Sequence, residues 1–248
     1  MLEFDDYSVG VILILCRIGT TLMIAPGFST ARVPARVRLY VAFALAVAMA
    51  PAVLGDNAVK PGGSGVVLVK LVFAECIVGA VIGLVCRFYI AALEFMANAI
   101  ANYVGLSALA GGIDNDDPAS PLATLITLVA TLLVLLMDLH QLLINTVLDS
   151  YGPIPLGVMA DPQFGIRMLS TALGAAFLIS LQVSGPFIVY GILVNVLFGI
   201  LGKLIPQVPS YFVSLPFLLM GGLFFVYLML PEMLKIFFGS FAAVLTNL

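Results

Sequence analysis

Six runs of apolar residues dominate this chain, at about 9–28, 39–54, 66–110, 122–148, 164–202 and 210–240. Hydrophobic residues make up 62% of the sequence and charged residues 9%, whereas soluble domains have about 45–50% and about 25%. This composition excludes a water-soluble globule, a disordered chain and a basic nucleic-acid binder. Because the runs are continuous, and do not alternate as the strands of an outer-membrane barrel do, the sequence predicts an all-α, polytopic integral membrane protein.

The third run, 66–110, is the longest of the six. A single membrane span needs only about 20 residues, and this run also contains Arg87 and Glu94. It is therefore either a helical hairpin or one very long helix.

The orientation of the chain rests on two loops. The turn with Arg32, Arg36 and Arg38 is typical of a cytoplasmic loop, because basic residues stay inside. The acidic loop 111–121 has no Lys or Arg and suits the outer side. Both placements hold only if 66–110 crosses twice, which puts the N-terminus outside and the C-terminus in the cytoplasm.

No residue pattern points to a cofactor or to catalysis. Cys16, Cys76 and Cys86 all lie in apolar runs, where cysteine commonly serves as a small hydrophobe. His140 is the single histidine, so a multi-histidine metal or haem site within the chain is excluded. The sequence contains no Walker loop, HExxH or GxSxG motif. We therefore expect neither a cofactor nor enzymatic activity.

A few charged or titratable residues do interrupt the apolar runs: Arg17, Lys70, Glu75, Glu94, Asp138 and His140. Each Arg, Lys or Asp of this kind costs about 2.5–3.5 kcal/mol in hydrocarbon and must face protein, water or the membrane interface. Asp138 and His140 are two residues apart, so they do not share a helix face. A helix end near the interface is favoured over a proton relay through this pair.

Glu75, Gly79 and Gly83 are spaced by four residues and therefore lie on one helical stripe. The GxxxG pattern lets another helix approach closely, and the carboxyl group can supply a polar contact to it. Helix packing is favoured over an ion site.

The acidic loop contains the sequence Gly111-Gly112-Ile113-Asp114-Asn115-Asp116-Asp117-Pro118. Counted from Asp114, it lacks the glycine and glutamate of a calcium-binding EF-hand, so a solvated loop is the simpler interpretation. The glycine pair also lets the chain fold back sharply. Such a loop can re-enter a lumen where it meets protein or water.

Short signatures extend over almost the whole length of the chain. They are Arg17-Ile18-Gly19, Ala25-Pro26, Pro34-x-x-x-Arg38, the stripe Glu75, Gly79 and Gly83, the segment 101–107, Asp138-Leu139-His140, Ser150-Tyr151, and the stretch 191–222 with Asn195, Gly199, Pro206, Gln207, Phe212 and Pro216. Together they resemble the FliR family, the export-gate proteins of the flagellum and their injectisome counterparts in type III secretion. The sequence departs from that pattern in its more acidic loop at 113–118 and in Val208-Pro209-Ser210.

The resemblance implies a structural subunit without catalysis, formed of long, bent helical hairpins in one domain, 1–248. It implies one copy per gate, assembled with FliP-like and FliQ-like membrane subunits beside an FlhB-like subunit, in the bacterial inner membrane at the flagellar basal body. The gate would pass unfolded flagellar proteins, and lipid would be a further partner, but nucleic acid would not.

A pore plug is also implied by the resemblance, at about residues 106–121. The candidate plug residues are Leu106, Ser107, Gly111, Gly112, Ile113, Asp114 and Pro118.

Two alternatives remain open. An injectisome gate subunit of the same family differs only in branch, and the Pro206-Gln207 region favours the flagellar one. An autonomous proton-coupled secondary transporter would instead use Glu75, Asp138 or His140.

Overall fold

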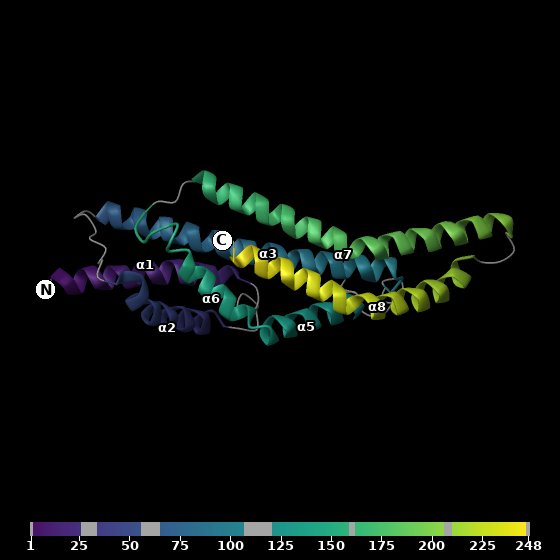
Figure 1. Ribbon diagram of the computed structural model, residues 1–248, viewed down its shortest axis with the longest axis horizontal. Coiled ribbons are helices and arrows are strands. Elements are labelled where there is room, and N and C mark those ends of the chain that lie inside the picture. The colour runs from purple at the N-terminus through teal and green to yellow at the C-terminus, as the bar shows by residue number, and fades with distance from the viewer. Residues whose placement is uncertain are drawn as a thin grey trace. The chain divides into compact units, whose positions relative to one another are not determined.

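The computed structural model describes residues 2–25, 34–55, 65–106, 121–158, 162–205 and 210–246. Every regular element in these ranges is an α-helix, which confirms the predicted all-α class. The helices are α1 (Leu2–Ile24), α2 (Ala35–Leu54), α3 (Gly65–Tyr103), α5 (Pro121–Leu136), α6 (Leu139–Asp149), α7 (Pro162–Leu204) and α8 (Ser210–Thr246) (Figure 1).

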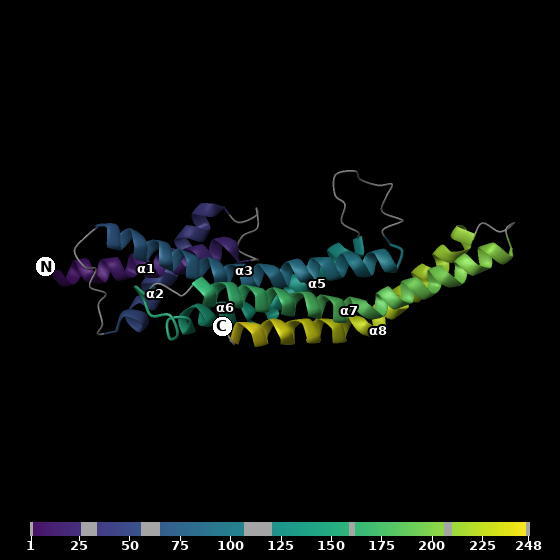
Figure 2. The same cartoon turned by 90° about the horizontal axis from the view of Figure 1, so that it is seen from above.

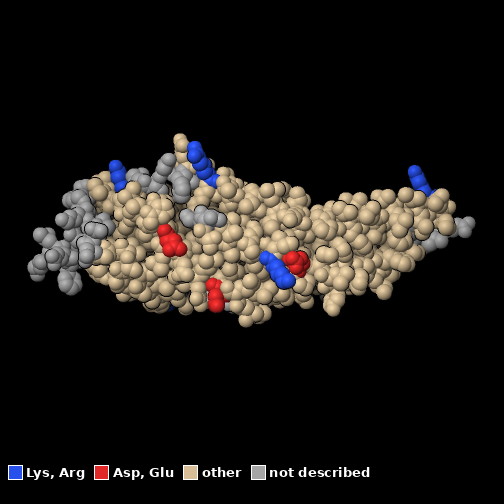
Figure 3. All heavy atoms as spheres, in the orientation of Figure 1, with Lys and Arg blue, Asp and Glu red and all other residues tan. Residues whose placement is uncertain are grey.

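Five of these helices are long and apolar enough to cross a membrane, namely α1, α2, α3, α7 and α8, and α5 is a shorter apolar helix. Their surfaces carry many exposed large hydrophobic side chains. The face drawn in Figure 3 is almost entirely uncharged, with a few scattered charged side chains, among them one basic and one acidic side chain that lie together. The prediction of a polytopic membrane protein is therefore confirmed.

The third apolar run forms one uninterrupted helix, α3, of 39 residues. The expectation that this run crosses the membrane twice is wrong, and the orientation that depended on it loses its basis. The physical reason is visible in the sequence, because this segment has no proline and only isolated glycines after its first residue, which a helix tolerates. Arg87 and Glu94 lie on its exposed face.

Prolines lie inside α2, α7 and α8, at Pro51, Pro186, Pro216 and Pro231. A proline inside a helix removes one backbone hydrogen bond and kinks the helix. Figures 1 and 2 show α7 bending along its course. This agrees with the expected long, bent helices.

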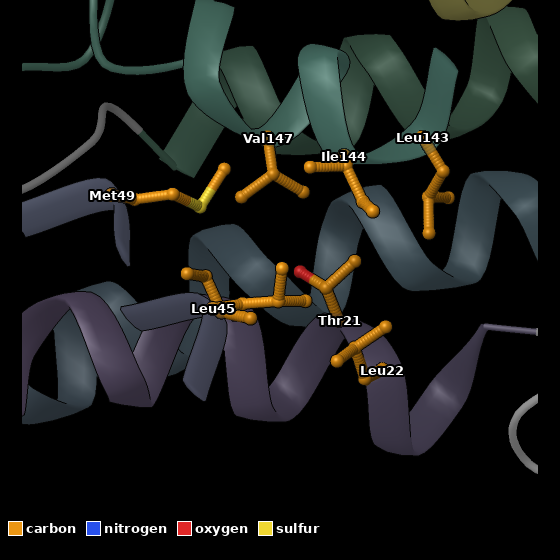
Figure 4. A pocket seen from close by; sticks show the side chains of 8 residues that line it. Thr21, Leu22, Leu45, Met49, Leu143, Ile144 and Val147 are labelled. Carbon is orange, nitrogen blue, oxygen red and sulfur yellow. The ribbon is translucent and has the colours of Figure 1, made fainter. Parts of the chain in front are cut away.

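The chain divides into two compact units. The first comprises Met1–Ile90, Asp138–Gly174 and Ala242–Leu248. Its core lies where α1, α2 and the first part of α3 meet, and includes the fully buried Leu13, Ile14 and Ala46. A small apolar pocket remains between α1, α2 and α6, lined by side chains that include Leu22, Met49 and Val147 (Figure 4).

The second unit comprises Ala91–Met137 and Ala175–Phe241. Within it α7 and α8 run side by side in both views of the chain (Figures 1 and 2). The Tyr190 hydroxyl lies 3.0 Å from the backbone oxygen of Phe217 and 3.1 Å from that of Leu218, and donates to them. The rings of Phe187 and Phe225 meet edge to face, with centroids 5.0 Å apart. Aromatic residues therefore join the two long helices.

Gly191 brings the end of α3 against α7 in the second unit. A Cβ atom at Gly191 would lie 2.7 Å from the Tyr103 ring and 3.0 Å from the Tyr103 backbone oxygen. The backbone oxygen cannot rotate away as a side chain can. The contact therefore depends on the absence of a side chain at this position.

We predict that Gly191→Ala lowers the free energy of unfolding of the chain by about 1–3 kcal/mol, the usual cost of overpacking. The measurement is the thermal unfolding midpoint of the purified chain in mild detergent. Gly174→Ala, also on α7 but with open space around it, is the control and is expected to be neutral or slightly stabilising, because alanine favours a helix. Equal midpoints for the two variants would contradict the packing described here.

Candidate functional site

The strongest polar feature of the first unit is a buried ion pair between α1 and α3. Arg17 Nε lies 2.6 Å from Glu75 Oε2, and the two side chains are 0% and 1% exposed. An unpaired charge in such surroundings would be very costly. Each of these two charged residues therefore supplies the partner that the other needs.

The chain that follows α6 completes the hydrogen bonding of both side chains. Arg17 Nη1 donates to Ser150 Oγ and Nη2 donates to the backbone oxygen of Ile154, each at 3.1 Å. The Gly157 N–H donates to Glu75 Oε1 at 3.1 Å. Gly157 has φ 81°, a left-handed backbone conformation that glycine adopts without strain. The ion pair thus ties a loop to two helices.

Tyr151 covers the guanidinium group from one side. The Cζ atom of Arg17 lies 3.9 Å from the centroid of the Tyr151 ring, a distance suited to a cation–π contact. Burial raises the pKa of the Tyr151 phenol well above its usual range, although the nearby Arg17 charge opposes this. The phenol is therefore neutral and adds no charge to the cluster.

Gly79 and Gly83 allow α1 and α3 to come this close. A Cβ atom at Gly79 would collide with the backbone oxygen of Arg17 and the hydroxyl of Thr20, and one at Gly83 would lie 3.0 Å from the backbone oxygen of Thr21. The Thr21 hydroxyl also lies 3.0 Å from the Gly79 backbone oxygen and donates to it. The stripe that begins at Glu75 thus lies directly against α1.

The cluster is suited to holding structure together. Arg17 and Glu75 occupy each other, and their remaining hydrogen-bonding atoms face Ser150, Ile154 and Gly157. Within the described ranges no group of three or more His, Cys, Asp or Glu side chains is placed to hold a metal ion. The arrangement fixes α1, α3 and the segment 150–158 relative to one another.

Asp138 lies at the break between α5 and α6. It has φ 54°, precedes the first residue of α6 and is exposed. Gln141 Nε2 lies 3.4 Å from Asp138 Oδ1, so the carboxylate contacts its own helix start. The side chain of His140 lies outside the described residues, and the interpretation as a helix end near the membrane interface stays a prediction.

The remaining family-signature residues are only partly described. Asn195 and Gly199 are exposed on α7, and Pro216 is exposed inside α8. Pro206, Gln207 and the side chain of Phe212 lie outside the described residues.

The predicted plug residues fall almost entirely in the segment 107–120, outside the described residues. They are Ser107, Gly111, Gly112, Ile113, Asp114 and Pro118. Leu106 is the last described residue before this segment and is half-buried. The plug assignment stays a prediction.

Sequence reasoning found both charges of the ion pair but did not pair them. It gave no role to Ser150 or Tyr151, and it did not single out Ile154 or Gly157. The available signal was one basic and one acidic residue within separate apolar runs, each of which needs a partner. Ile154 and Gly157 contribute through backbone groups. The side chain of Ile154 therefore carries no signal, and Gly157 signals only a turn, because glycine adopts its positive φ without strain.

Comparison with known proteins gives a consistent result. Residues 9–244 match the family described as bacterial export proteins, family 1. The chain is similar to proteins named flagellar biosynthetic protein FliR from several bacteria. It is 28% identical to that of Caulobacter vibrioides over 217 residues, which cover 85% of this chain and 84% of the relative.

Two further relatives carry the same name. The Bacillus subtilis protein is 30% identical over 219 residues, covering 85% of this chain and 82% of the relative. The Escherichia coli protein is 27% identical over 222 residues, covering 88% of this chain and 82% of the relative. The similarity therefore extends over most of both chains.

The buried ion pair makes a direct prediction about stability. Glu75→Gln should lower the free energy of unfolding by about 3–5 kcal/mol, because it leaves Arg17 buried and uncompensated. The double variant Arg17→Met, Glu75→Leu should recover much of that loss, because it removes both buried charges. The measurement is thermal or denaturant unfolding of the chain in mild detergent.

The chain contains a matched control for this experiment. Glu232 and Lys235 on α8 lie 3.6 Å apart but are 65% and 75% exposed, and exposed pairs contribute about 0–1 kcal/mol. Glu232→Gln should therefore change little. A Glu75→Gln variant as stable as Glu232→Gln would show that the buried pair does not hold the unit together.

Proposed function

The chain belongs to the bacterial export proteins, family 1, and on this premise we propose that it is a structural, non-catalytic subunit of the flagellar type III protein export gate. The shared name of the relatives, flagellar biosynthetic protein FliR, supports the flagellar branch over the injectisome branch. The gate passes unfolded flagellar proteins across the bacterial inner membrane at the flagellar basal body.

The observation that carries this proposal is the length of the apolar helices. With 43 residues and a rise of 1.5 Å per residue, α7 is about 65 Å long, whereas the hydrocarbon core of a bilayer is about 30 Å thick. A straight helix of this length would have to tilt by about 60° to stay within that core, beyond the 0–40° range of known spans, and α7 also contains Pro186 and bends along its course. Lipid alone does not suit a helix of this length.

The second half of α7 exposes large apolar side chains that lipid or another protein has to cover. Large apolar residues are solvent-exposed on its second half, among them Ile192, Leu193, Val196, Leu197, Ile200 and Leu204. Such an apolar surface suits lipid within the bilayer, and suits a neighbouring protein wherever α7 extends beyond it. The proposed partners are FliP-like and FliQ-like membrane subunits, assembled with one copy of this chain, and an FlhB-like subunit beside them.

The backbone at the end of α3 is held in a defined conformation. The Leu106 N–H donates to the Ala101 backbone oxygen and the Gly105 N–H to that of Asn102, each at 3.1 Å, and Gly105 has φ 84°. These bonds form a Schellman motif, a common helix ending. Gly105 also lies against Leu218 of α8, so the end of α3 is packed within the second unit.

We assign the plug of the proposed gate to the segment that follows this fixed end, residues 106–121. A pore wide enough for a polypeptide would leak ions when idle and needs a seal. A glycine-bearing loop leaving a rigid helix end can block the lumen and move aside for substrate, which is a two-state shift driven by substrate and partner contacts.

The surroundings of Glu75 bear on the alternative that the chain is a proton-coupled transporter. A proton-coupled carrier needs a carboxylate that binds and releases protons as it works. Glu75 is held at 1% exposure by Arg17 and by the Gly157 N–H. This environment favours a structural role for the carboxylate.

The first prediction from the proposal concerns assembly. A tagged chain extracted from its native membrane in mild detergent should be recovered in a large complex with two other kinds of small polytopic protein. Native mass determination should find one copy of the tagged chain per complex. The proposal would be contradicted if the chain were recovered only as a monomer or homodimer and chemical cross-linking before extraction also found no partner.

The second prediction concerns the plug. Deletion of residues 110–118 should leave the complex assembled but make the membrane leaky to small ions, because the closed pore loses its seal. The readout is ion flux or growth sensitivity to salt. The control is the same deletion in cells lacking the FliP-like subunit, where no pore forms and no leak is expected. Normal ion tightness of the assembled deletion variant would contradict the plug assignment.

A further inference from the structure

Two of the three cysteines lie together beside the buried ion pair. Cys16 precedes Arg17 on α1, and Cys76 follows Glu75 on α3. The two thiols lie within hydrogen-bonding reach of one another. Both are free and half-buried, whereas Cys86 is free and only 1% exposed. The pair is therefore the one place within the described ranges where two thiols from different helices meet.

The backbones of α1 and α3 approach closely within one turn of the thiols. A disulfide requires Cα atoms about 4.4–6.8 Å apart. Facing positions of two helices at the usual axial distance of about 8–10 Å can meet this requirement, because each Cα atom lies about 2.3 Å from its helix axis. Gly79, three residues after Cys76, lies so close to α1 that a Cβ atom would collide with the Arg17 backbone oxygen. Glycine packing thus keeps the two backbones in close contact within one turn of the thiols.

The contacts around the pair hold the two helices in one register. Arg17 Nε lies 2.6 Å from Glu75 Oε2, and the Thr21 hydroxyl donates to the Gly79 backbone oxygen at 3.0 Å. In both views α1 and α3 run side by side in the same direction (Figures 1 and 2). On α3, Cys76 lies between the two contact residues Glu75 and Gly79, and on α1, Cys16 directly precedes the first contact residue, Arg17. The register of the two helices therefore keeps the two cysteines at the same level.

We propose that Cys16 and Cys76 form a reversible dithiol–disulfide site that covalently joins α1 to α3. Its reaction partners are small lipid-soluble disulfides, which can reach half-buried thiols in an apolar surface. One thiol gives up its proton and its sulfur attacks the reagent disulfide, forming a mixed disulfide and releasing one small thiol. The second cysteine sulfur then attacks the protein sulfur of the mixed disulfide, closes the Cys16–Cys76 bond and releases the second small thiol.

The exchange gives a product that the mass of the protein and the number of released small thiols can identify. Two S–H bonds of the protein break, one S–S bond forms, and both protons leave on the two released small thiols. A cysteine without a neighbour stops at the mixed disulfide and keeps the reagent fragment attached. The two outcomes differ in the mass of the protein and in the number of small thiols released.

The test uses the full chain in mild detergent and 2,2′-dithiodipyridine, whose released thione is coloured. The parent is Cys86→Ala, which limits the reaction to the two cysteines in question. We expect two thiones per chain, no pyridylthio adduct, and a mass lower by two hydrogens, all reversed by dithiothreitol. A peptide map should then contain the Cys16–Cys76 cross-link.

Cys16→Ser and Cys76→Ser in the same parent are the matched controls. Each should release one thione and retain one adduct. If either variant fails to fold, the parent still decides the matter, because closure and adduct formation give different masses in one sample. Stable adducts on both cysteines of the parent, or no reaction of either thiol in the folded chain, would overturn the proposal.

Discussion

The packing of the first unit depends on a buried positive charge that needs an oppositely charged partner. Arg17 is fully buried in an apolar helix, and among the described residues Glu75 is the one that brings an opposite charge to it. A buried pair of this kind gains little over apolar side chains of similar size, so its value lies in geometry. It fixes which face of α1 meets α3, and the loop that follows α6 must supply the remaining hydrogen bonds.

The glycines beside the pair bring the two helices into close contact. Gly79 and Gly83 let the backbones of α1 and α3 approach, and the charged side chains meet at 2.6 Å next to that contact. Gly157 then turns the loop so that its N–H meets the carboxylate. The charge, the small residues and the turn are thus parts of one solution to burying polar groups.

Much of this was readable in the sequence, because membrane helices have few ways to satisfy polar groups. Continuous apolar runs predicted the all-α class, and the spacing of Glu75, Gly79 and Gly83 predicted a packing stripe. The length of the run 66–110 did not distinguish a hairpin from one long helix, because both can satisfy the backbone hydrogen bonds in lipid. The absence of proline within Gly65–Tyr103 was the better indicator.

The backbone contributions to the site could not be predicted for a different reason. Ile154 and Gly157 meet the ion pair through a carbonyl and an N–H group, and every residue has a backbone carbonyl. Only the path of the loop decides which ones reach the pair. Ser150 and Tyr151 belonged to a recognisable signature, but their neighbours in space come from helices more than seventy residues earlier in the chain.

Each unit leaves part of its surface for other molecules to cover. In the first unit Arg17 and Glu75 meet each other and the loop after α6, while the buried Tyr151 hydroxyl has no hydrogen-bond partner among the described residues. In the second unit the distal part of α7 leaves an apolar face open, as Leu193, Leu197 and Leu204 show, and the helix is longer than a bilayer is thick. Large apolar side chains of the first unit, such as Val69 and Phe73, are exposed as well. Both units therefore offer apolar surface for lipid or neighbouring proteins to cover, and in the first unit the ion pair fixes the helices that present this surface.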